Sequence, residues 1–241
     1  MNNILELAVF NMQSALIAAA GGADRIEVCE NYANGGTTPS YGILKTLREK
    51  VAIPAFVMIC PRAGDFLYPD EEFEVIKKDI AICKKLGFDG IVCGILNIDG
   101  TIDQDRTAQL IELAYPLEFT FHRAFDRCKD PFQALEYLIE QGCDRILTSG
   151  QKANVLDGKE LIKQLIEKAD DRITILPGGG LRSSNVAELK AFTGAVEFHT
   201  SAKKVMHTKM RFINSAMNDD TDQISVDVEE IRRIKSLIGA D

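Results

Sequence analysis

One short phrase recurs four times along this 241-residue chain, and it constrains the fold more than any other feature. Each copy has a Gly, one variable residue, a short polar residue and then an apolar run rich in β-branched residues. The copies begin at Gly22, Gly87, Gly142 and, in a weaker form, Gly194, so their spacings are 65, 55 and 52 residues. Each period has room for two strand–helix units. The Gly suits the residue after a helix, where φ is positive, and the chain then enters a strand.

Further strand candidates lie between these copies, at residues 4–10, 55–60, 117–122 and 172–176. Amphipathic helical patterns separate most of the strands, as at residues 72–86, 103–114, 131–141, 158–169 and 185–192. Alternating strands and helices indicate a parallel sheet. Eight such units in about 200 residues predict an α/β fold, a (β/α)₈ TIM-type barrel in one domain. A doubly wound sheet is the alternative, but four pseudo-repeats favour a closed ring.

The pattern changes after residue 202, so we expect a barrel over residues 1–202 and a C-terminal extension over residues 203–241. Residues 214–227 are polar and are expected to form a loop. Residues 228–238 predict a final amphipathic helix. The extension is expected to pack on the barrel or on a partner subunit.

Composition limits the kinds of partner and the location. The net charge of −8 argues against nucleic acid or an anionic membrane as a partner. No run of eighteen apolar residues predicts a membrane span, and the first residues do not resemble a signal peptide. The six cysteines are scattered without a Cys-x-x-Cys pair, which favours reduced thiols in a cytoplasmic protein. We predict no organic cofactor.

Aligning the four copies assigns side chains to layers inside the barrel, because a layer takes four side chains from alternate strands. The layer at the closed end would contain Arg25, Gly90, Arg145 and Glu197. The middle layer would contain Glu27, Val92, Leu147 and His199. The layer at the mouth would contain Cys29, Gly94, Ser149 and Ser201, whose small side chains leave space for a ligand.

This assignment separates a structural end from a functional end. Charge at the closed end is expected to stabilise the barrel, whereas ligands bind at the C-terminal ends of the strands. Glu27 and His199, with Glu6 from the first strand, would line the ligand space. Together with His122, Glu27 and His199 are the candidate acid and base groups.

Polar residues at the ends of the third and fifth strands add candidate ligand contacts. His122, Arg123 and Asp126 lie within five residues, and Arg123 could bind a carboxylate or phosphate. The structural alternative is that Asp126 caps the following helix and pairs with Arg123. Arg62 would reach over the mouth, where Asp65 could hold it.

Small-residue turns follow the sixth and seventh strands. Ser149 and Gly150 lie in the first turn and Gly179 and Gly180 in the second, where backbone N–H groups could bind an anion. Ser201, after the eighth strand, is a further candidate ligand contact. A tight turn with no ligand is the structural alternative.

Two cysteines end adjacent strands and could face inward. Cys29 and Cys60 would then form a two-thiolate site, which copper(I) prefers. Free cysteine is also one of the most buried residue types, so packing alone would explain both residues.

Phrases spread along nearly the whole chain closely resemble the CutC family of copper homeostasis proteins. They start at Gly22, Gly35, Gly64, Thr120, Arg145, Pro177 and Glu197 and include Gly-Ala-Asp-Arg-Ile-Glu-Val-Cys, Phe-His-Arg-Ala-Phe-Asp and Pro-Gly-Gly-Gly. The resemblance implies a TIM-barrel-like fold, a cytoplasmic homo-oligomer, most simply a dimer, and a role in copper handling through copper(I) binding.

The chain departs from the family pattern at two places that bear on copper. The family's Glu-x-Cys in the first strand has Ala8 here in place of the cysteine, and the loop after the third strand has Cys60 and Ala63 in place of Arg and Gly. Three functions therefore stay open: a copper-binding protein, a barrel enzyme for a small anionic substrate with or without a phosphate, and a scaffold that binds a partner through residues 203–241.

Overall fold

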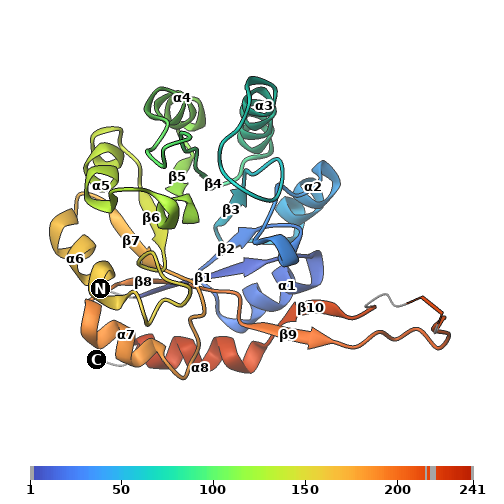
Figure 1. The fold of residues 1–241 in the computed structure, drawn as a ribbon. Coiled ribbons are helices and arrows are strands. Elements are labelled where there is room, and N and C mark those ends of the chain that lie inside the picture. Colours follow the sequence, from blue (N-terminus) through green and yellow to red (C-terminus); the bar gives the residue numbers. More distant parts are fainter. Residues whose placement is uncertain (1–2, 215, 218–220, 240–241) are drawn as a thin grey trace.

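The computed structural model describes residues 3–214, 216–217 and 221–239, and its centre is a ring of eight parallel strands (Figure 1). Ladders run in the order β7-β6-β5-β4-β3-β2-β1-β8, and β7 and β8 lie beside each other where the ring closes. The expected (β/α)₈ barrel is therefore confirmed. The strands are β1 (Ile4–Val9), β2 (Arg25–Val28), β3 (Ala55–Met58), β4 (Gly90–Cys93), β5 (Glu118–Phe121), β6 (Arg145–Thr148), β7 (Thr174–Pro177) and β8 (Glu197–Thr200).

Helices surround this ring and bury their apolar faces against it (Figure 1). Side-chain caps at Asn11, Asp103 and Asp130 start three of them by accepting backbone N–H groups. The helices are α1 (Met12–Gly21), α2 (Tyr41–Lys50), α3 (Asp70–Leu86), α4 (Gln104–Ala114), α5 (Pro131–Glu140), α6 (Lys159–Ala169), α7 (Val186–Thr193) and α8 (Val228–Gly239), with short 3₁₀ turns at η1 (Tyr32–Asn34) and η2 (Arg123–Arg127).

The recurring phrase has a structural reason in both of its fixed positions. Its glycines all have positive φ, between 73° and 100°, where each helix ends. Its short polar residue is an Asp in the first three copies. Asp24, Asp89 and Asp144 each accept a hydrogen bond from the backbone N–H near the start of a neighbouring strand, at 2.7–2.9 Å. The fourth copy has the exposed Val196 at this position, which explains why the phrase is weaker there.

The inside of the barrel is filled at the closed end by Phe56. The guanidinium groups of Arg25 and Arg145 lie 4.8 and 5.3 Å from the centroid of its ring. A Cβ at Gly90 would lie 2.8 Å from the same ring, so the missing side chain makes room for it. These side chains therefore fill the barrel at this end.

The segment after β8 forms a hairpin that projects from the barrel (Figure 1). β9 (Lys203–Met206) pairs antiparallel with β10 (Gln223–Val226). The expected loop over residues 214–227 is therefore wrong at β10. Ile224 and Val226 alternate with polar residues there, and the strand pairs with β9. Residues 215 and 218–220 of that expected loop lie outside the described residues.

The last helix, α8, occupies the place between α7 and α1 and so completes the ring of helices. Ile231, Ile234 and Ile238 form its fully buried face. Glu230 accepts hydrogen bonds of 2.8 Å from the Ser183 backbone N–H and hydroxyl, ahead of α7. On the other side, Lys235 pairs with Asp24 at 2.6 Å. None of the helices in the described ranges is both long and apolar enough to cross a membrane.

Candidate functional site

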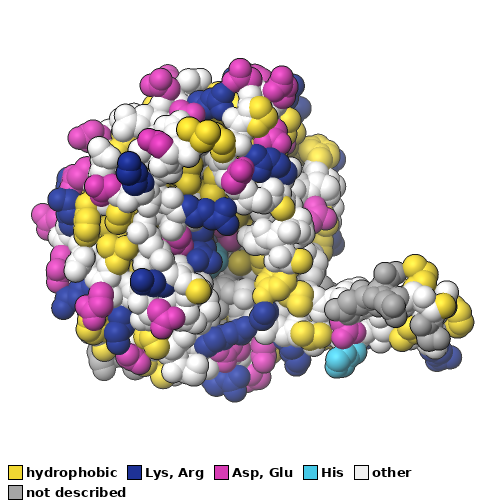
Figure 2. Space-filling model, viewed as in Figure 1, with side chains coloured by type: hydrophobic (Ala, Val, Ile, Leu, Met, Phe, Trp, Pro, Cys, Tyr) yellow, Lys and Arg dark blue, Asp and Glu magenta, His cyan; other side chains and the backbone are white. Residues whose placement is uncertain are grey.

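A cavity of about 640 Å³ opens at the C-terminal ends of the strands, and we call it the mouth cavity. Its walls come from η1 and from the loops that follow β3, β5, β7 and β8, while Glu27 and His199 reach it from inside the barrel. Figure 2 shows Lys and Arg side chains around a hollow near the centre of this view. A basic rim on a chain with net charge −8 favours anions at this place.

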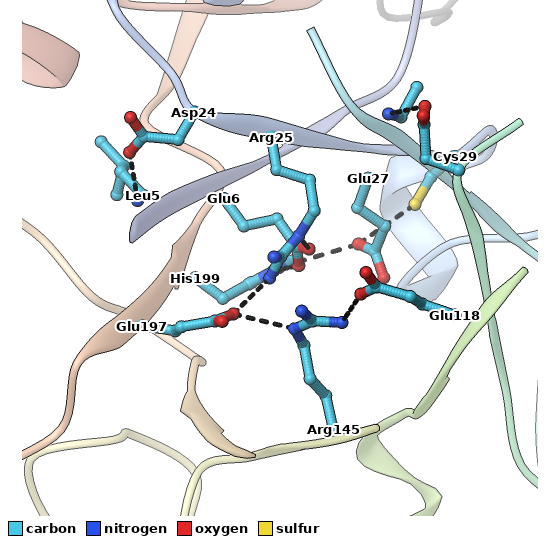
Figure 3. Close-up of polar contacts among 12 residues, drawn as sticks. Leu5, Glu6, Asp24, Arg25, Glu27, Cys29, Glu118, Arg145, Glu197 and His199 are labelled. Atoms are coloured by element: carbon cyan, nitrogen blue, oxygen red, sulfur yellow. Dashed lines mark hydrogen bonds and ion pairs between the residues drawn. The ribbon is translucent and has the colours of Figure 1, made fainter. Parts of the chain in front are cut away.

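Glu27 of β2 and His199 of β8 form the floor of the cavity, and Glu6 of β1 lies just beneath them (Figure 3). His199 Nδ1 lies 2.7 Å from Glu6 Oε1, and His199 Nε2 lies 3.7 Å from Glu27 Oε2. Strand register causes this meeting, because Glu6 is the partner of His199 in one ladder and of Arg25 in the other. The two carboxylates therefore face the same imidazole from opposite sides.

The two carboxylates differ in pKa because their partners differ. Burial raises the pKa of Glu6, but attraction to Arg25 and hydrogen bonding to His199 outweigh burial and lower the pKa to about 2. Burial raises the pKa of Glu27, and attraction to His199 offsets only part of this. Burial lowers the pKa of His199, but attraction to Glu27 and the hydrogen bond to Glu6 outweigh it, so this pKa is raised. Glu6 is thus held as an anion, whereas burial disfavours the ionised form of Glu27.

Below this floor lies an ion-pair cluster that we call the closed-end cluster: Glu6, Arg25, Glu197, Arg145 and Glu118 (Figure 3). Glu197 Oε2 accepts from both guanidinium groups, at 2.6 Å from Arg25 and 2.9 Å from Arg145. The predicted pairing of two arginines with a glutamate at this end is confirmed. Sequence reasoning missed Glu118, and it placed Glu6 in the ligand space, whereas Glu6 lies beneath the cavity and does not line it.

His122 lines the mouth cavity from the end of β5. Its Nδ1 accepts the backbone N–H of Ala124 at 3.2 Å, and the ring of Phe66 packs on it with centroids 4.5 Å apart. Burial lowers the pKa of His122 to about 4, so the ring is neutral near pH 7. A Cβ at Gly94 would lie 2.7 Å from Nδ1. The space beside Gly94 is therefore filled by His122, and the expectation that it is left for a ligand is wrong.

Arg123 and Asp126 belong to a network that joins the loops after β5 and β6. Arg123 donates to Asp126 at 2.7 Å and to the Ser149 hydroxyl at 2.8 Å. Asp126 also accepts the backbone N–H groups of Ser149 and Gln151, both at 3.1 Å. Its expected role as a helix cap is wrong, since Asp130 caps α5. Asp126 instead fixes the loop after β6 and the direction of Arg123.

The remaining predicted ligand contacts divide into two groups. Arg123, Asp126, Gly179, Gly180 and Ser201 line the cavity. Ser149 and Gly150 are buried and do not line it, and Ser149 instead holds Arg123 in place.

Arg62 lines the rim with its charge already paired. It contacts the predicted partner Asp65 at 2.9 Å and, in addition, Glu72 at 3.0 Å. Arg127 also lines the cavity and was missed, although it follows Arg123 by one helical turn. Arg62 thus faces two carboxylates, whereas Arg123 faces one, Asp126.

Cys29 and Cys60 are both buried and lie in one cluster with Met58. Cys29 Sγ donates to Glu27 at 3.4 Å, and Cys60 Sγ donates to the Arg62 carbonyl at 3.1 Å. Burial, followed by repulsion from Glu27, raises the pKa of the Cys29 thiol well above its usual range. Within the described ranges, no group of three or more His, Cys, Asp or Glu side chains is arranged to hold a metal ion. Met58 was missed, although it alternates with Phe56 and Cys60.

Fold and site together define a parallel (β/α)₈ barrel with buried ionisable side chains beneath its mouth and a basic rim around it. Comparison with known proteins gives the particular group: the model of the CutC family matches residues 3–204, and the chain belongs to this family. A CutC family protein of Parabacteroides distasonis is 45% identical over 241 residues and covers 100% of this chain and 99% of its own length.

Two further relatives extend the comparison. A human protein named copper homeostasis protein cutC homolog is 44% identical and covers 97% of this chain and 87% of its own length. The crystal structure of a CutC copper homeostasis protein from Streptococcus agalactiae superposes with a TM-score of 0.78 at 33% identity, over 83% of this chain and 98% of that one. A thiamine phosphate pyrophosphorylase from Pyrococcus furiosus, at 16% identity and a TM-score of 0.60, shares the fold alone.

His122 makes stability depend on pH in a defined window. Burial lowers the pKa of His122 from an ordinary 6.5 to about 4 in the folded chain. The contribution of the neutral ring to the free energy of unfolding is therefore complete above pH 6.5 and is lost as pH falls towards 4. The shift corresponds to about 3 kcal/mol. In urea unfolding at pH 7, 6, 5 and 4, wild type should lose about this much more stability than His122→Asn, which keeps an acceptor for the Ala124 N–H. Equal pH dependence in the two proteins would contradict this.

Proposed function

We propose that the mouth cavity is the functional site, and that it binds a small organic anion with which Glu27 and His199 exchange a proton. The observation that carries this proposal is Glu27 itself. Its side chain lines the cavity, lies 3.7 Å from His199 and has one oxygen, Oε1, without a hydrogen-bond partner. A buried carboxylate oxygen left unpaired in a cavity of this size is suited to contact a ligand.

The rim supports an anionic ligand. Arg123, Arg127, Arg182 and Lys203 all line the cavity together with the glycines at 179 and 180. A Cβ at Gly179 would lie 3.0 Å from Ser149 Cβ and 3.4 Å from Arg123 Cζ, so the glycine lets backbone and guanidinium approach each other. Arg123 Nε and one Nη are used by Asp126 and Ser149, which leaves a fixed, partly exposed guanidinium edge for the ligand.

Binding of 2-phosphoglycolate, which has both a carboxylate and a phosphate, tests this proposal by isothermal titration calorimetry. Arg123→Gln should weaken binding by about 10- to 100-fold, as expected for loss of a charge-assisted hydrogen-bonded pair. Arg48→Gln is the matched control, because Arg48 pairs with Asp89 at 2.8 Å and does not line the cavity. Absence of binding to wild type, or equal weakening by both substitutions, would contradict the proposal.

The names of the relatives favour a second function, copper handling, and the sulfur cluster is the observation that supports it here. We propose that Cys29 and Cys60, with the Met58 thioether, hold copper(I) as cargo. A Cβ at Gly36 would lie 3.4 Å from both Cys29 Sγ and Met58 Cε, so these two sulfur side chains meet beneath the same glycine. Because the Cys29 thiol must lose its proton to bind, copper affinity should rise with pH.

Copper(I) affinity, measured anaerobically against a competing chelator, tests the second function. The double variant Cys29→Ser/Cys60→Ser should lose the tight binding of wild type. Cys83→Ser is the control, since Cys83 is equally buried but belongs to the outer face of the core on α3. Equal copper(I) affinity in all three proteins would contradict the proposal that copper binds at Cys29 and Cys60.

We also propose that the chain is a cytoplasmic homodimer, with a barrel domain over residues 1–202 and residues 203–241 as an extension that contributes the subunit contact. All six cysteines are free and buried, which suits a reducing compartment. Apolar side chains are exposed along the hairpin segment, among them Val205, Met210, Phe212 and Ile213. Replacing Phe212 and Ile213 by Ser should lower the molar mass found by light scattering from dimer to monomer, and an unchanged mass would contradict the hairpin contact.

A further inference from the structure

Two buried polar atoms in the mouth cavity's wall have no hydrogen-bond partner, and they are chemically complementary. They are Glu27 Oε1 and His122 Nε2. In the described part of the chain, the other unpaired buried side-chain atoms are the hydroxyls of Thr107 and Thr120, and neither residue lines the cavity. An unpaired buried polar group costs free energy, so its presence calls for a partner that arrives with a ligand.

His122 is a fixed hydrogen-bond donor. Its Nδ1 accepts from the Ala124 backbone N–H, so the proton of the neutral ring is on Nε2. The ring is held between Phe66 and the space left by Gly94, which prevents it from turning. Nε2–H can therefore serve a ligand oxygen that gains negative charge during a reaction.

Glu27 is the matching acceptor. Its Oε2 faces His199 and accepts the Cys29 thiol, so the carboxylate is held from one side and Oε1 is left free. Glu6 and the closed-end cluster fix His199 behind it. A carboxylate that is desolvated and held in this way is a suitable base for a weakly acidic C–H group.

We propose that the cavity takes a small 2-hydroxycarbonyl compound with an anionic tail, and that Glu27 and His122 catalyse proton exchange at its hydroxyl-bearing carbon. This inference rests on the proposed function, because it names the chemical class of the anion bound in the same cavity. The carbonyl oxygen accepts from His122 Nε2–H, the neighbouring carbon faces Glu27 Oε1, and the tail meets Arg123 and Arg182 at the rim.

The reaction needs no further reactant. Glu27 takes the proton from the hydroxyl-bearing carbon, and the C–H electron pair forms a C=C bond while the C=O electron pair moves to oxygen. The product is an enediolate whose oxyanion is stabilised by His122 Nε2–H. Glu27 then returns a proton to the same carbon: the C=C electron pair forms the C–H bond and the oxyanion's electron pair restores the C=O bond, which regenerates the substrate. Because the Glu27 proton can exchange with solvent in between, the returned atom can be a solvent hydrogen. Nothing is oxidised or reduced overall.

Entry of the ligand requires a small movement. The Phe66 ring covers His122, and it lies in the loop after β3 that also contains Gly64, with φ of +111°. Arg127 stacks on Phe66 at 5.1 Å and donates to the Gly64 carbonyl, so the loop and the rim are linked. An anion that draws Arg127 away would release Phe66 and open the path to His122.

Solvent exchange tests the inference directly. Wild type is incubated in D₂O with dihydroxyacetone phosphate, glyceraldehyde 3-phosphate or hydroxypyruvate, and loss of the ¹H signal at the hydroxyl-bearing carbon is followed by NMR. We expect exchange above the buffer rate with at least one probe. Glu27→Gln should slow it by about 10³-fold or more, and His122→Phe by about 10²- to 10³-fold. His122→Gln, which can still donate a hydrogen bond, should restore part of the rate.

Each outcome has a stated meaning. Arg48→Gln should exchange at the wild-type rate, and circular dichroism melting verifies that every variant folds. Exchange with no probe overturns the inference, and so does exchange that is unchanged in Glu27→Gln. If 2-phosphoglycolate still binds wild type while no probe exchanges, the inference fails alone. If neither binding nor exchange is found, the proposed function fails with it.

Discussion

Glu197→Gln should lower the free energy of unfolding by about 3–5 kcal/mol, the largest loss of stability that we expect from a single change in the barrel interior. Glu197 is buried and neutralises two arginines, Arg25 at 2.6 Å and Arg145 at 2.9 Å. The amide keeps the size of the side chain but removes the negative charge that pairs with both guanidinium groups inside the barrel. Urea unfolding at pH 7 measures the loss.

Glu118→Gln is the matched control for this prediction. Glu118 also pairs with Arg145, but its side chain is 48% exposed, so water replaces the lost charge. The expected cost is about 1 kcal/mol or less. Similar costs for the two substitutions would show that the burial of Glu197 does not strengthen its ion pairs.

Gly158→Ala should destabilise the protein by about 3 kcal/mol and remove anion binding at the mouth. The added methyl group has no space, because backbone atoms already lie against Gly158. A Cβ at Gly158 would lie 1.9 Å from the Ser149 backbone oxygen and 2.8 Å from Gly150 Cα. Backbone atoms cannot turn aside as a side chain can, so the loop after β6 must move. That loop positions Ser149, which holds Arg123 and Asp126. Thermal unfolding and titration with 2-phosphoglycolate measure the two effects.

Gly42→Ala provides the control. Gly42 lies in α2, and a Cβ there would lie 3.9 Å from its nearest neighbour, the Ser40 hydroxyl. Alanine in an unobstructed helix position should stabilise by about 0.5–1 kcal/mol. Wild-type stability and anion binding in Gly158→Ala would contradict the close backbone approach.

The sequence by itself determined the barrel and the order of its interior layers. The spacing of the recurring phrase gave the number of strand–helix units, and the two-residue period of a strand decided which side chains face inward. Aligning Arg25, Arg145 and Glu197 was sufficient to predict that they meet. The strand β10 was missed because its paired residues in β9 lie 17 to 23 positions earlier, and its four residues are a weak pattern by themselves.

Only the tertiary structure decided how the site is assembled. Glu6 and His199 are 193 residues apart in the chain, and the stagger of strands where β8 meets β1 brings them to 2.7 Å. Glu27 Oε1 and His122 Nε2 are left without hydrogen-bond partners, and the pairing of β5 with β6 places Asp126 against the backbone of the loop after β6. Local alternation fixes the direction of each side chain, whereas the contacts across the barrel depend on the register and closure of all eight strands. This is why the sequence could name most of the site's residues but not which of them pair and which are left free for a ligand.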